Sequence, residues 1–322
     1  MSNPRPRLVG AISSDIDTLH SLYKGHGLRR AAYSYAEMQI GLENFARFLE
    51  PYGVNATLFM VGHDFHQPQN VASIRGMAAA GHEIANHSMT HAQGFRLLPA
   101  HQMEAEVAGM EEACLAVIGR RPVGFRSPGW NIGDSAVELL KRRGYLYDSS
   151  VHPTSLMPLF KFLHWWNTRS RTGPDRTTMG QLNYMLSPLR PYRTSPYSLA
   201  QRGSGGLVEL PVTVVPGIRL PFWATFLLAS GLGVFKASLE VLVAMRMPMQ
   251  FQFHLSDFVD FNTREFVDQV PRAGDGVYVP RALWTPLATK RELFTRAMDL
   301  LTEHYTCIPL EQWASQVETG RA

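Results

Sequence analysis

Two histidines four residues apart, His87 and His91, are the strongest sign of chemistry in the sequence. On a single helical turn, side chains at this spacing point the same way. Two neutral imidazoles joined by one distant carboxylate form a three-ligand site with an open coordination position, which is how proteins hold a hydrolytic metal. Because paired histidines also occur on ordinary helix surfaces, the rest of the sequence must decide between the two interpretations.

Carboxylates that suit such a site stand near the start of the chain, in Asp15-Ile16-Asp17, after a strand-like run over 8–13. Residues two apart in an extended strand point to the same side. Two carboxylates at a strand end suit a division of labour, in which one binds a metal and the other acts as a base. The alternative is a loop or helix cap with solvated acids.

The elements that must position these residues alternate between strand-like runs and helical patterns. This alternation is typical of βα units and a mostly parallel sheet, and about seven units favour a (β/α) barrel over an open sheet. The first strand is not followed by the Gly-rich motif of dinucleotide-binding proteins. The predicted strands are 8–13, 57–61, 83–86, 123–125, 207–212, 250–254 and 305–310, and the predicted helices are 33–49, 71–80, 103–118, 135–143 and 291–301.

The polar residues fall at one end of this predicted barrel. The third strand leads into His87 and His91, the fourth into Arg126, and a late strand ends at His254. Active sites of such barrels gather at the C-terminal ends of the strands. Independent surface residues would not be expected to coincide in this way.

The segment Gly81–His91 (Gly-His-Glu-Ile-Ala-Asn-His-Ser-Met-Thr-His) resembles the metal-binding motif of the polysaccharide deacetylases, also called the NodB-homology or carbohydrate esterase 4 group. Motifs resembling the family's others follow its order at 15–17, 126–129, 147–150 and His254, so that the resemblance covers about residues 8–310. It implies an α/β fold, a distorted seven-stranded (β/α) barrel, in a single domain over 1–322 with a long insertion at about 153–206.

The resemblance also implies a role for each motif residue. Asp17, His87 and His91 would bind a divalent metal, most often zinc in this family and sometimes cobalt or manganese. Asp15 would be the general base, Arg126 would orient it, His254 would be the general acid, and the Gly129 N–H would complete the oxyanion hole.

Two details of these roles stay open in the sequence. The commonest family pattern has adjacent aspartates, whereas Ile16 separates Asp15 from Asp17, so the two could exchange roles. The spaced form resembles a branch with smaller or intracellular substrates. A protonated His254 needs a nearby carboxylate, for which Asp148, Asp257 and Asp260 are the alternatives.

The region 153–206 shows no periodicity and is rich in basic and aromatic residues, with Asp175 as its only acid. We interpret it as an insertion over one end of the barrel, in which a sugar would stack on Trp or Tyr and Arg would hold a phosphate. A lid or a dimer contact built of ordinary core residues is the alternative. The residues concerned are Lys161, Arg169, Arg171, Arg176, Arg190, Arg193 and Arg202, with Phe160, Phe162, Trp165, Trp166, Tyr184, Tyr192 and Tyr197.

The net charge of +4 is too mild and too spread out to indicate nucleic acid, but it fits an anionic ligand or a membrane surface. The N-terminus lacks the apolar core of a signal peptide, which predicts a cytoplasmic protein with a cytosol-accessible substrate. The apolar stretch 220–235 is interrupted by Pro221, Gly231 and Gly233 and is too short to span a bilayer, although it could meet lipid.

The resemblance to the polysaccharide deacetylases implies a hydrolase of linear amide C–N bonds that removes an acetyl or formyl group from an amino sugar. The Pro211-Val212-Thr213 sequence resembles the branch that acts on sugars carried by a lipid, so we expect a lipid-linked or glycolipid substrate, at the cytoplasmic face of the membrane. The alternatives are a cytosolic amidohydrolase of a soluble amino sugar or small cyclic amide, and a catalytically silent carbohydrate- or lipid-binding protein. The sequence leaves the acyl group, the sugar, the metal and the oligomeric state open.

Overall fold

The computed structural model describes residues 6–21, 36–167, 177–270 and 281–320. In these ranges nine strands form one sheet in the order β6-β7-β5-β4-β3-β2-β1-β8, and β9 pairs with the start of β1. The strands are β1 (Leu8–Ile16), β2 (Thr57–Met60), β3 (Glu83–Asn86), β4 (Gly124–Phe125), β5 (Tyr147–Asp148), β6 (Tyr192–Arg193), β7 (Val208–Glu209), β8 (Met249–His254) and β9 (Tyr305–Cys307).

The path from β7 through β5, β4, β3, β2 and β1 to β8 consists of seven parallel strands, and β6 joins β7 antiparallel. No ladder between described residues joins β7 to β8. The Gln250 N–H instead donates to Thr213 Oγ1 at 2.8 Å across that gap. The sheet is therefore an incompletely closed barrel, which confirms the predicted distorted seven-stranded (β/α) barrel.

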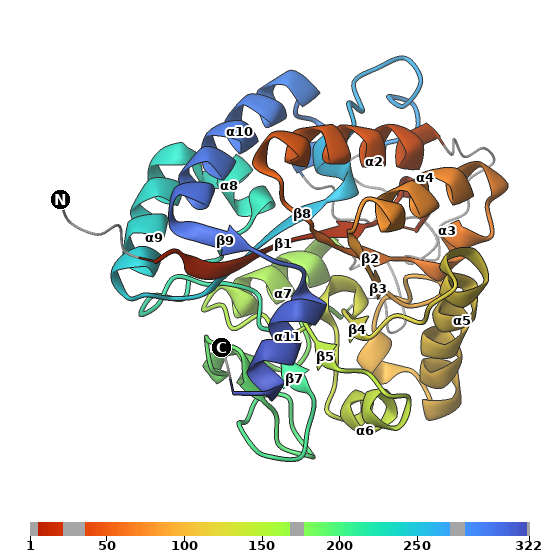
Figure 1. The fold of residues 1–322 in the computed structure, drawn as a ribbon, viewed down its shortest axis with the longest axis vertical. Coiled ribbons are helices and arrows are strands. Elements are labelled where there is room, and N and C mark those ends of the chain that lie inside the picture. The colour runs from red at the N-terminus through yellow and green to blue at the C-terminus, as the bar shows by residue number, and fades with distance from the viewer. Residues whose placement is uncertain (1–5, 22–35, 168–176, 271–280, 321–322) are drawn as a thin grey trace.

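The predicted helices are all present, because each has buried residues at helical spacing. In α5, for example, Met103, Val107, Met110 and Cys114 are buried on one face. Figure 1 shows α2 and α10 on one side of β1 and β8, and α5 and α6 at the far end of the molecule. None of the described helices has both the length and the hydropathy to cross a membrane. The predicted helices correspond to α2 (Ala36–Leu49), α4 (Pro68–Ala79), α5 (Ala100–Ile118), α6 (Ser135–Arg142) and α10 (Leu287–His304), with 33–35 outside the described residues.

The region 153–206 contains regular elements although its sequence shows no periodicity. It contains the helix α7 (Met157–Asn167), the 3-10 helix η5 (Leu182–Leu186) and β6. The sequence did not predict α7 because this helix is apolar on both faces, so its apolar and polar residues do not alternate with the 3.6-residue period of a surface helix. Four more helices were not predicted, namely α3 (Gly62–Phe65), α8 (Ala224–Ser230), α9 (Leu232–Ala244) and α11 (Leu310–Glu318).

The strand ends differ slightly from those predicted. The strand β1 extends to Ile16, so Asp15 lies inside the strand and Asp17 directly follows it. At the other end of the chain, α11 begins at Leu310, which leaves β9 shorter than the predicted run 305–310. The assignment of the whole chain, 1–322, to a single domain stays a prediction.

Candidate active site and metal centre

The site forms where β1 and β8 end side by side. Asp15 and His254 are register partners of these two parallel strands, so both lie at the same level of the barrel. A carboxylate oxygen of Asp15, one of Asp17 and a ring nitrogen of His254 lie within 4.8 Å of one another. The sheet thereby brings together residues that are more than 230 positions apart in the sequence.

A second group of three ligand atoms overlaps the first at Asp17. The Asp17 Oδ1 atom lies 3.3 Å from His87 Nε2 and 3.2 Å from His91 Nε2. All three atoms are buried, and none has a hydrogen-bond partner among the described residues. One carboxylate and two imidazoles are the donor set of a hydrolytic zinc site, and converging buried lone pairs need a cation. The residues therefore fit a divalent metal.

His87 and His91 do not share a helical turn, contrary to our expectation. His87 directly follows β3, and His91 lies in the loop after it. The loop turns back because Ser88 and His91 have positive φ angles, of 66° and 55°. The amide N–H groups of Gly62 and His63 donate to the carbonyls of Ser88 and Met89, at 3.0 and 2.8 Å, and hold this loop in place.

The environment fixes the state of the His87 ring. Its Nδ1 lies 2.7 Å from the Arg126 carbonyl oxygen, which can only accept, so Nδ1 carries a proton, and in the neutral ring the lone pair is on Nε2, which faces Asp17. Burial lowers the pKa of His87, but Asp17 and Asp15 beside it outweigh burial and raise it. Burial likewise raises the pKa of Asp17, but His91 and His87 outweigh it and hold that pKa well below its usual range.

Asp15 is held from two sides. Arg126 Nη1 donates to its Oδ1 at 2.6 Å, and Gln252 Nε2 donates to its Oδ2 at 2.8 Å. Arg126 is itself fully buried and donates from Nε to the Ser149 carbonyl at 2.9 Å. These bonds fix the orientation of the Asp15 carboxylate. Arg126 thus contacts Asp15 directly, and its role in orienting a general base stays a prediction.

Among the three acids considered for His254, Asp257 is the one in contact with it. Asp257 Oδ2 accepts the His254 backbone N–H at 2.9 Å, and its Oδ1 is buried without a hydrogen-bond partner among the described residues. Burial raises the pKa of Asp257, and the nearby His254 opposes that rise. Asp260 instead accepts from Asn262 and Leu287, and Asp148 accepts from Ser150.

Gly129 lies in a short 3-10 turn after β4, η3 (Pro128–Trp130), with a φ of 57° that favours glycine. Its carbonyl accepts the Met179 N–H at 2.9 Å and the Thr178 hydroxyl at 3.1 Å. The orientation of the peptide is therefore anchored by the segment after α7. The role of the Gly129 N–H as an oxyanion donor stays a prediction.

An aromatic wall lies next to His254. The Trp130 ring stacks on Trp223 at 4.4 Å between centroids and meets the His254 ring edge-on at 6.3 Å. His152 packs against both indoles, and burial lowers its pKa to about 3, so the ring is neutral. Both His152 ring nitrogens and the Trp130 indole nitrogen are buried and lack partners among the described residues. A bound polar ligand would satisfy them.

Two buried acids lie behind Arg126. Glu209 accepts the Val151 N–H at 3.1 Å, and Asp148 accepts the Ser150 N–H at 3.0 Å and its hydroxyl at 2.7 Å. Burial raises the pKa of both carboxyl groups, and for Glu209 the neighbouring Asp148 raises it further, to well above its usual range. Burial and the neighbouring Asp148 therefore both disfavour the charged form of Glu209.

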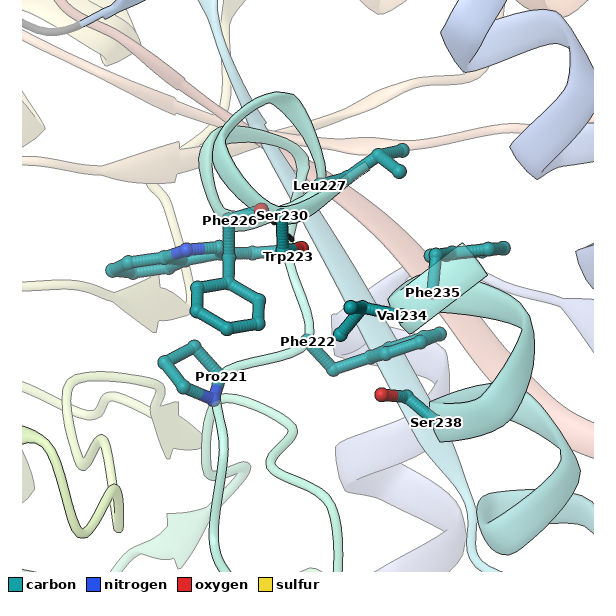
Figure 2. Close-up of a pocket in the computed structure, with 9 residues that line it drawn as sticks. All are labelled: Pro221, Phe222, Trp223, Phe226, Leu227, Ser230, Val234, Phe235 and Ser238. Atoms are coloured by element: carbon teal, nitrogen blue, oxygen red, sulfur yellow. Dashed lines mark hydrogen bonds between the residues drawn. The ribbon is translucent and has the colours of Figure 1, made fainter. Parts of the chain in front are cut away.

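Part of the apolar stretch 220–235 belongs to the core. Phe222, Leu227 and Phe235 are almost fully buried, whereas Val234 is 38% exposed, and contact of this stretch with lipid stays a prediction. Figure 2 shows the small pocket that it forms, where Phe222 faces Val234 and Phe235. The cavity of about 10 Å³ has room for about one water molecule and is lined by no titratable residue. It is too small for a sugar.

The basic and aromatic residues of the region 153–206 differ in how far they are buried. Tyr184 and Tyr192 are buried, whereas Phe162, Trp165, Trp166 and Tyr197 are exposed. Lys161 Nζ donates to the carbonyls of Thr178 and Gly180, at 2.5 and 2.7 Å. No phosphate-binding role can be assigned to Arg169, Arg171 and Arg176, which lie, with Asp175, outside the described residues.

Sequence reasoning missed Gln252, Glu209 and His152. Gln252 had a readable signal, because Gln250, Gln252 and His254 alternate along β8 and so share the face of the strand that points into the barrel. Glu209 stands alone between apolar residues, and only its burial against Asp148 shows its relation to the site.

The sequence matches the family model described as polysaccharide deacetylase over residues 39–147. That segment contains His87, His91, Arg126 and Gly129. A peptidoglycan deacetylase-like protein of Gibberella zeae is 30% identical over 120 residues, which are 35% of this chain and 33% of the relative. The peptidoglycan deacetylase of Helicobacter pylori is 25% identical over 122 residues, 38% of this chain and 41% of the relative. The chain thus matches less than half of the length of these curated relatives.

Two solved structures resemble the whole chain. A candidate polysaccharide deacetylase from Mycobacterium smegmatis has a TM-score of 0.62 at 20% identity, covering 100% of this chain and 94% of the other. PuuE allantoinase has a TM-score of 0.59 at 13% identity, covering 100% and 96%. At these identities the likeness concerns the fold. Over residues 39–147, which contain the histidine loop and the Arg126 motif, the chain is similar to the polysaccharide deacetylase family, and the fold places Asp15, Asp17 and His254 beside these two motifs.

Proposed function

We propose that this protein is a metal-dependent hydrolase that removes an N-acyl group, acetyl or formyl, from an amino sugar. The observation that carries the proposal is the convergence of Asp17 Oδ1, His87 Nε2 and His91 Nε2, three buried atoms without hydrogen-bond partners among the described residues, next to Asp15 and His254. A silent binding protein would have no use for a base and an acid arranged around such a centre.

In this proposal Asp17, His87 and His91 hold the metal. A bound divalent ion supplies Lewis-acid polarisation of the amide carbonyl and acidifies water. Zinc is the first choice for this ligand set, with cobalt or manganese as alternatives. Asp15, oriented by Arg126 and Gln252, accepts the proton of the attacking water.

The remaining residues serve the oxyanion and the leaving group. The Gly129 N–H donates to the developing oxyanion, and one such donor contributes roughly 3 kcal/mol. His254 protonates the leaving amine, which a positioned acid accelerates by about 10²- to 10⁴-fold. Asp257 accepts the His254 backbone N–H and so fixes the end of β8 from which the His254 ring projects.

The substrate that we propose is a lipid-linked or glycolipid amino sugar, reached from the cytoplasmic face of the membrane. The sugar would lie against the stacked rings of Trp130 and Trp223. The Trp130 indole nitrogen and the His152 ring nitrogens there are buried and lack hydrogen-bond partners among the described residues. A soluble amino sugar or a small cyclic amide is the second candidate, favoured by the spacing of Asp15 and Asp17 around Ile16.

The test combines metal analysis with an assay of acetate and formate release from N-acyl amino sugars, both free and lipid-linked. Replacing His91 with Ala removes a ligand, and we expect loss of stoichiometric metal and a fall in kcat of roughly 100-fold or more. The matched control is His101→Ala, an exposed histidine on α5. If metal content and activity survive His91→Ala, the site is wrongly assigned. Activity on a cyclic amide such as allantoin, and on no N-acyl sugar, would favour the second candidate.

A further inference from the structure

The helix α7 has two apolar faces, and among the described residues only one of these faces packs into the core. Met157 is fully buried, and Phe160 packs against the same hydrophobic cluster. On the opposite face Leu159, Phe162 and Leu163 are 49%, 53% and 40% exposed. A helix that is apolar all round is normally buried on all sides.

The exposed face forms one continuous stripe. Leu159, Phe162, Leu163 and Trp166 have the i, i+3, i+4, i+7 spacing of a helix face, and Trp165 extends it. The Phe162 ring lies 6.1 Å from Trp165 and 6.2 Å from Trp166, between centroids. We call these five residues the α7 face. They are five of the sixteen large apolar residues that are exposed in the described part of the chain.

More exposed apolar side chains lie nearby. Leu182 and Leu186, 58% and 81% exposed, belong to η5, which contacts α7. Ile218 is 60% exposed, and its carbonyl accepts the Ser155 hydroxyl, just before α7, at 2.7 Å. Apolar patches of this extent on a soluble protein mark a binding surface.

We propose that the α7 face docks onto an anionic lipid surface. This inference rests on the proposed lipid-linked substrate and names the surface by which the enzyme reaches it. Trp, Phe and Leu on one helix face suit the boundary between headgroups and acyl chains. In the sequence, the region 153–206 that carries α7 has seven basic residues against one acid. Of those that the structure describes, Arg190 and Arg202 are exposed, and a positive charge complements anionic headgroups.

The same charge disfavours a second copy of the chain as the occupant. A twofold dimer interface brings each patch against itself, so the basic region would face its own copy. Like charges there repel, whereas an anionic bilayer attracts them.

The α7 face is also tied to the site. Lys161, on the covered side of α7, holds the carbonyls of Thr178 and Gly180, and the Thr178 hydroxyl donates to the Gly129 carbonyl. A membrane bound at α7 therefore lies one short segment away from the peptide that we expect to meet the oxyanion.

The test measures binding of the full chain to vesicles of phosphatidylcholine with 30 mol% phosphatidylglycerol, at low and high NaCl. We expect salt-sensitive binding, and a loss of affinity of roughly tenfold or more in the double variant F162E/L163E, because both side chains would leave the apolar layer. The matched control is Trp284→Glu, which changes an exposed apolar residue outside the α7 face (47% exposed) and should bind like the wild type. Hydrogen exchange in the wild type supplies a second readout, with new protection of 157–167 on vesicle addition.

Three results would overturn the proposal: no vesicle binding by the wild type, equal binding by F162E/L163E, or a wild-type dimer that this variant converts to a monomer. If the double variant does not fold, the hydrogen exchange of the wild type decides alone. Hydrolysis of a soluble N-acyl sugar is measured on the same samples. Activity without vesicle binding overturns the docking surface only, and vesicle binding without activity or bound metal overturns the proposed function.

Discussion

Arg126 Nη1 lies 2.6 Å from Asp15 Oδ1, and both side chains are almost completely buried. The guanidinium also donates to the Ser149 carbonyl and hydroxyl, both at 2.9 Å. Lysine cannot reproduce this fork of donors. We expect Arg126→Lys to lower kcat about 100-fold, the size of effect that a misplacement of about 1 Å produces. The measurement is steady-state hydrolysis by the metal-loaded protein.

The matched control for this substitution is Arg143→Lys. Arg143 also makes a two-pronged contact, with both bonds to Glu111 at 2.8 Å, but it lies on the outside of the barrel. Both variants should lose roughly 1–3 kcal/mol of stability, because buried acceptors lose donors. Only Arg126→Lys should lose activity. Equal kcat values for the two variants would refute the orienting role of Arg126.

Gln252 is the second residue that holds Asp15, through Nε2 to Oδ2 at 2.8 Å. Replacing it with Leu leaves that oxygen without its donor while the metal ligands stay intact. We expect kcat/KM to fall about tenfold, the lower end of what the loss of a supporting hydrogen bond costs at such centres. Metal content should not change. An activity equal to that of Gln102→Leu, on the exposed side of α5, would show that Gln252 has no part in positioning Asp15.

The folded state alone offers the complete metal site, since Asp17 is 70 residues or more away from His87 and His91 in the sequence. A ligand that binds only the folded state stabilises it by about 3 kcal/mol at a free concentration of 100 times Kd. We therefore expect EDTA to lower Tm by several degrees. His91→Ala should melt at the same temperature with and without EDTA. A wild type that is insensitive to chelation would contradict the three-ligand site.

The sequence could predict that the site residues lie close together, because the C-terminal ends of parallel strands all lie at one end of a barrel. Asp15, Asp17, Arg126 and His254 all end up there for that reason. The loop that carries His91 could not be predicted. Its positive φ angles depend on amide N–H groups of a different segment, those of Gly62 and His63, which hold its carbonyls. Local spacing alone favoured a helical turn.

The sequence also could not predict which apolar segments are buried in the core. The stretches 157–167 and 220–235 are both rich in Phe, Trp and Leu, and composition does not distinguish them. The structure buries Phe222 and Phe235 in the core but leaves Phe162 exposed. Which apolar segment faces solvent depends on how much of its surface the other elements of the barrel can cover, and this is decided only in the assembled fold.

Glu83, in the same motif as the histidines, gives a prediction about pH. Its carboxylate is buried and accepts from the Thr57 hydroxyl at 2.6 Å, the Tyr147 hydroxyl at 2.7 Å and the Glu311 N–H at 2.9 Å. Burial raises the pKa of Glu83 from 4.5 to about 7, although the Thr57 and Tyr147 hydrogen bonds oppose the rise. The folded state therefore holds a proton between pH 4.5 and 7 that the unfolded state releases.

It follows that Glu83 costs stability as the pH rises through this window, by about 3 kcal/mol in total. Glu83→Gln keeps the shape of the side chain and cannot ionise, so this cost disappears. We expect the unfolding free energy of the variant, relative to that of the wild type, to grow by that amount between pH 4.5 and 8. Urea unfolding of both proteins at the two pH values measures it, and every other titrating group cancels in the difference. A difference that stays constant with pH would mean that Glu83 is already ionised in the folded protein at pH 4.5, with Thr57, Tyr147 and Glu311 outweighing the effect of burial.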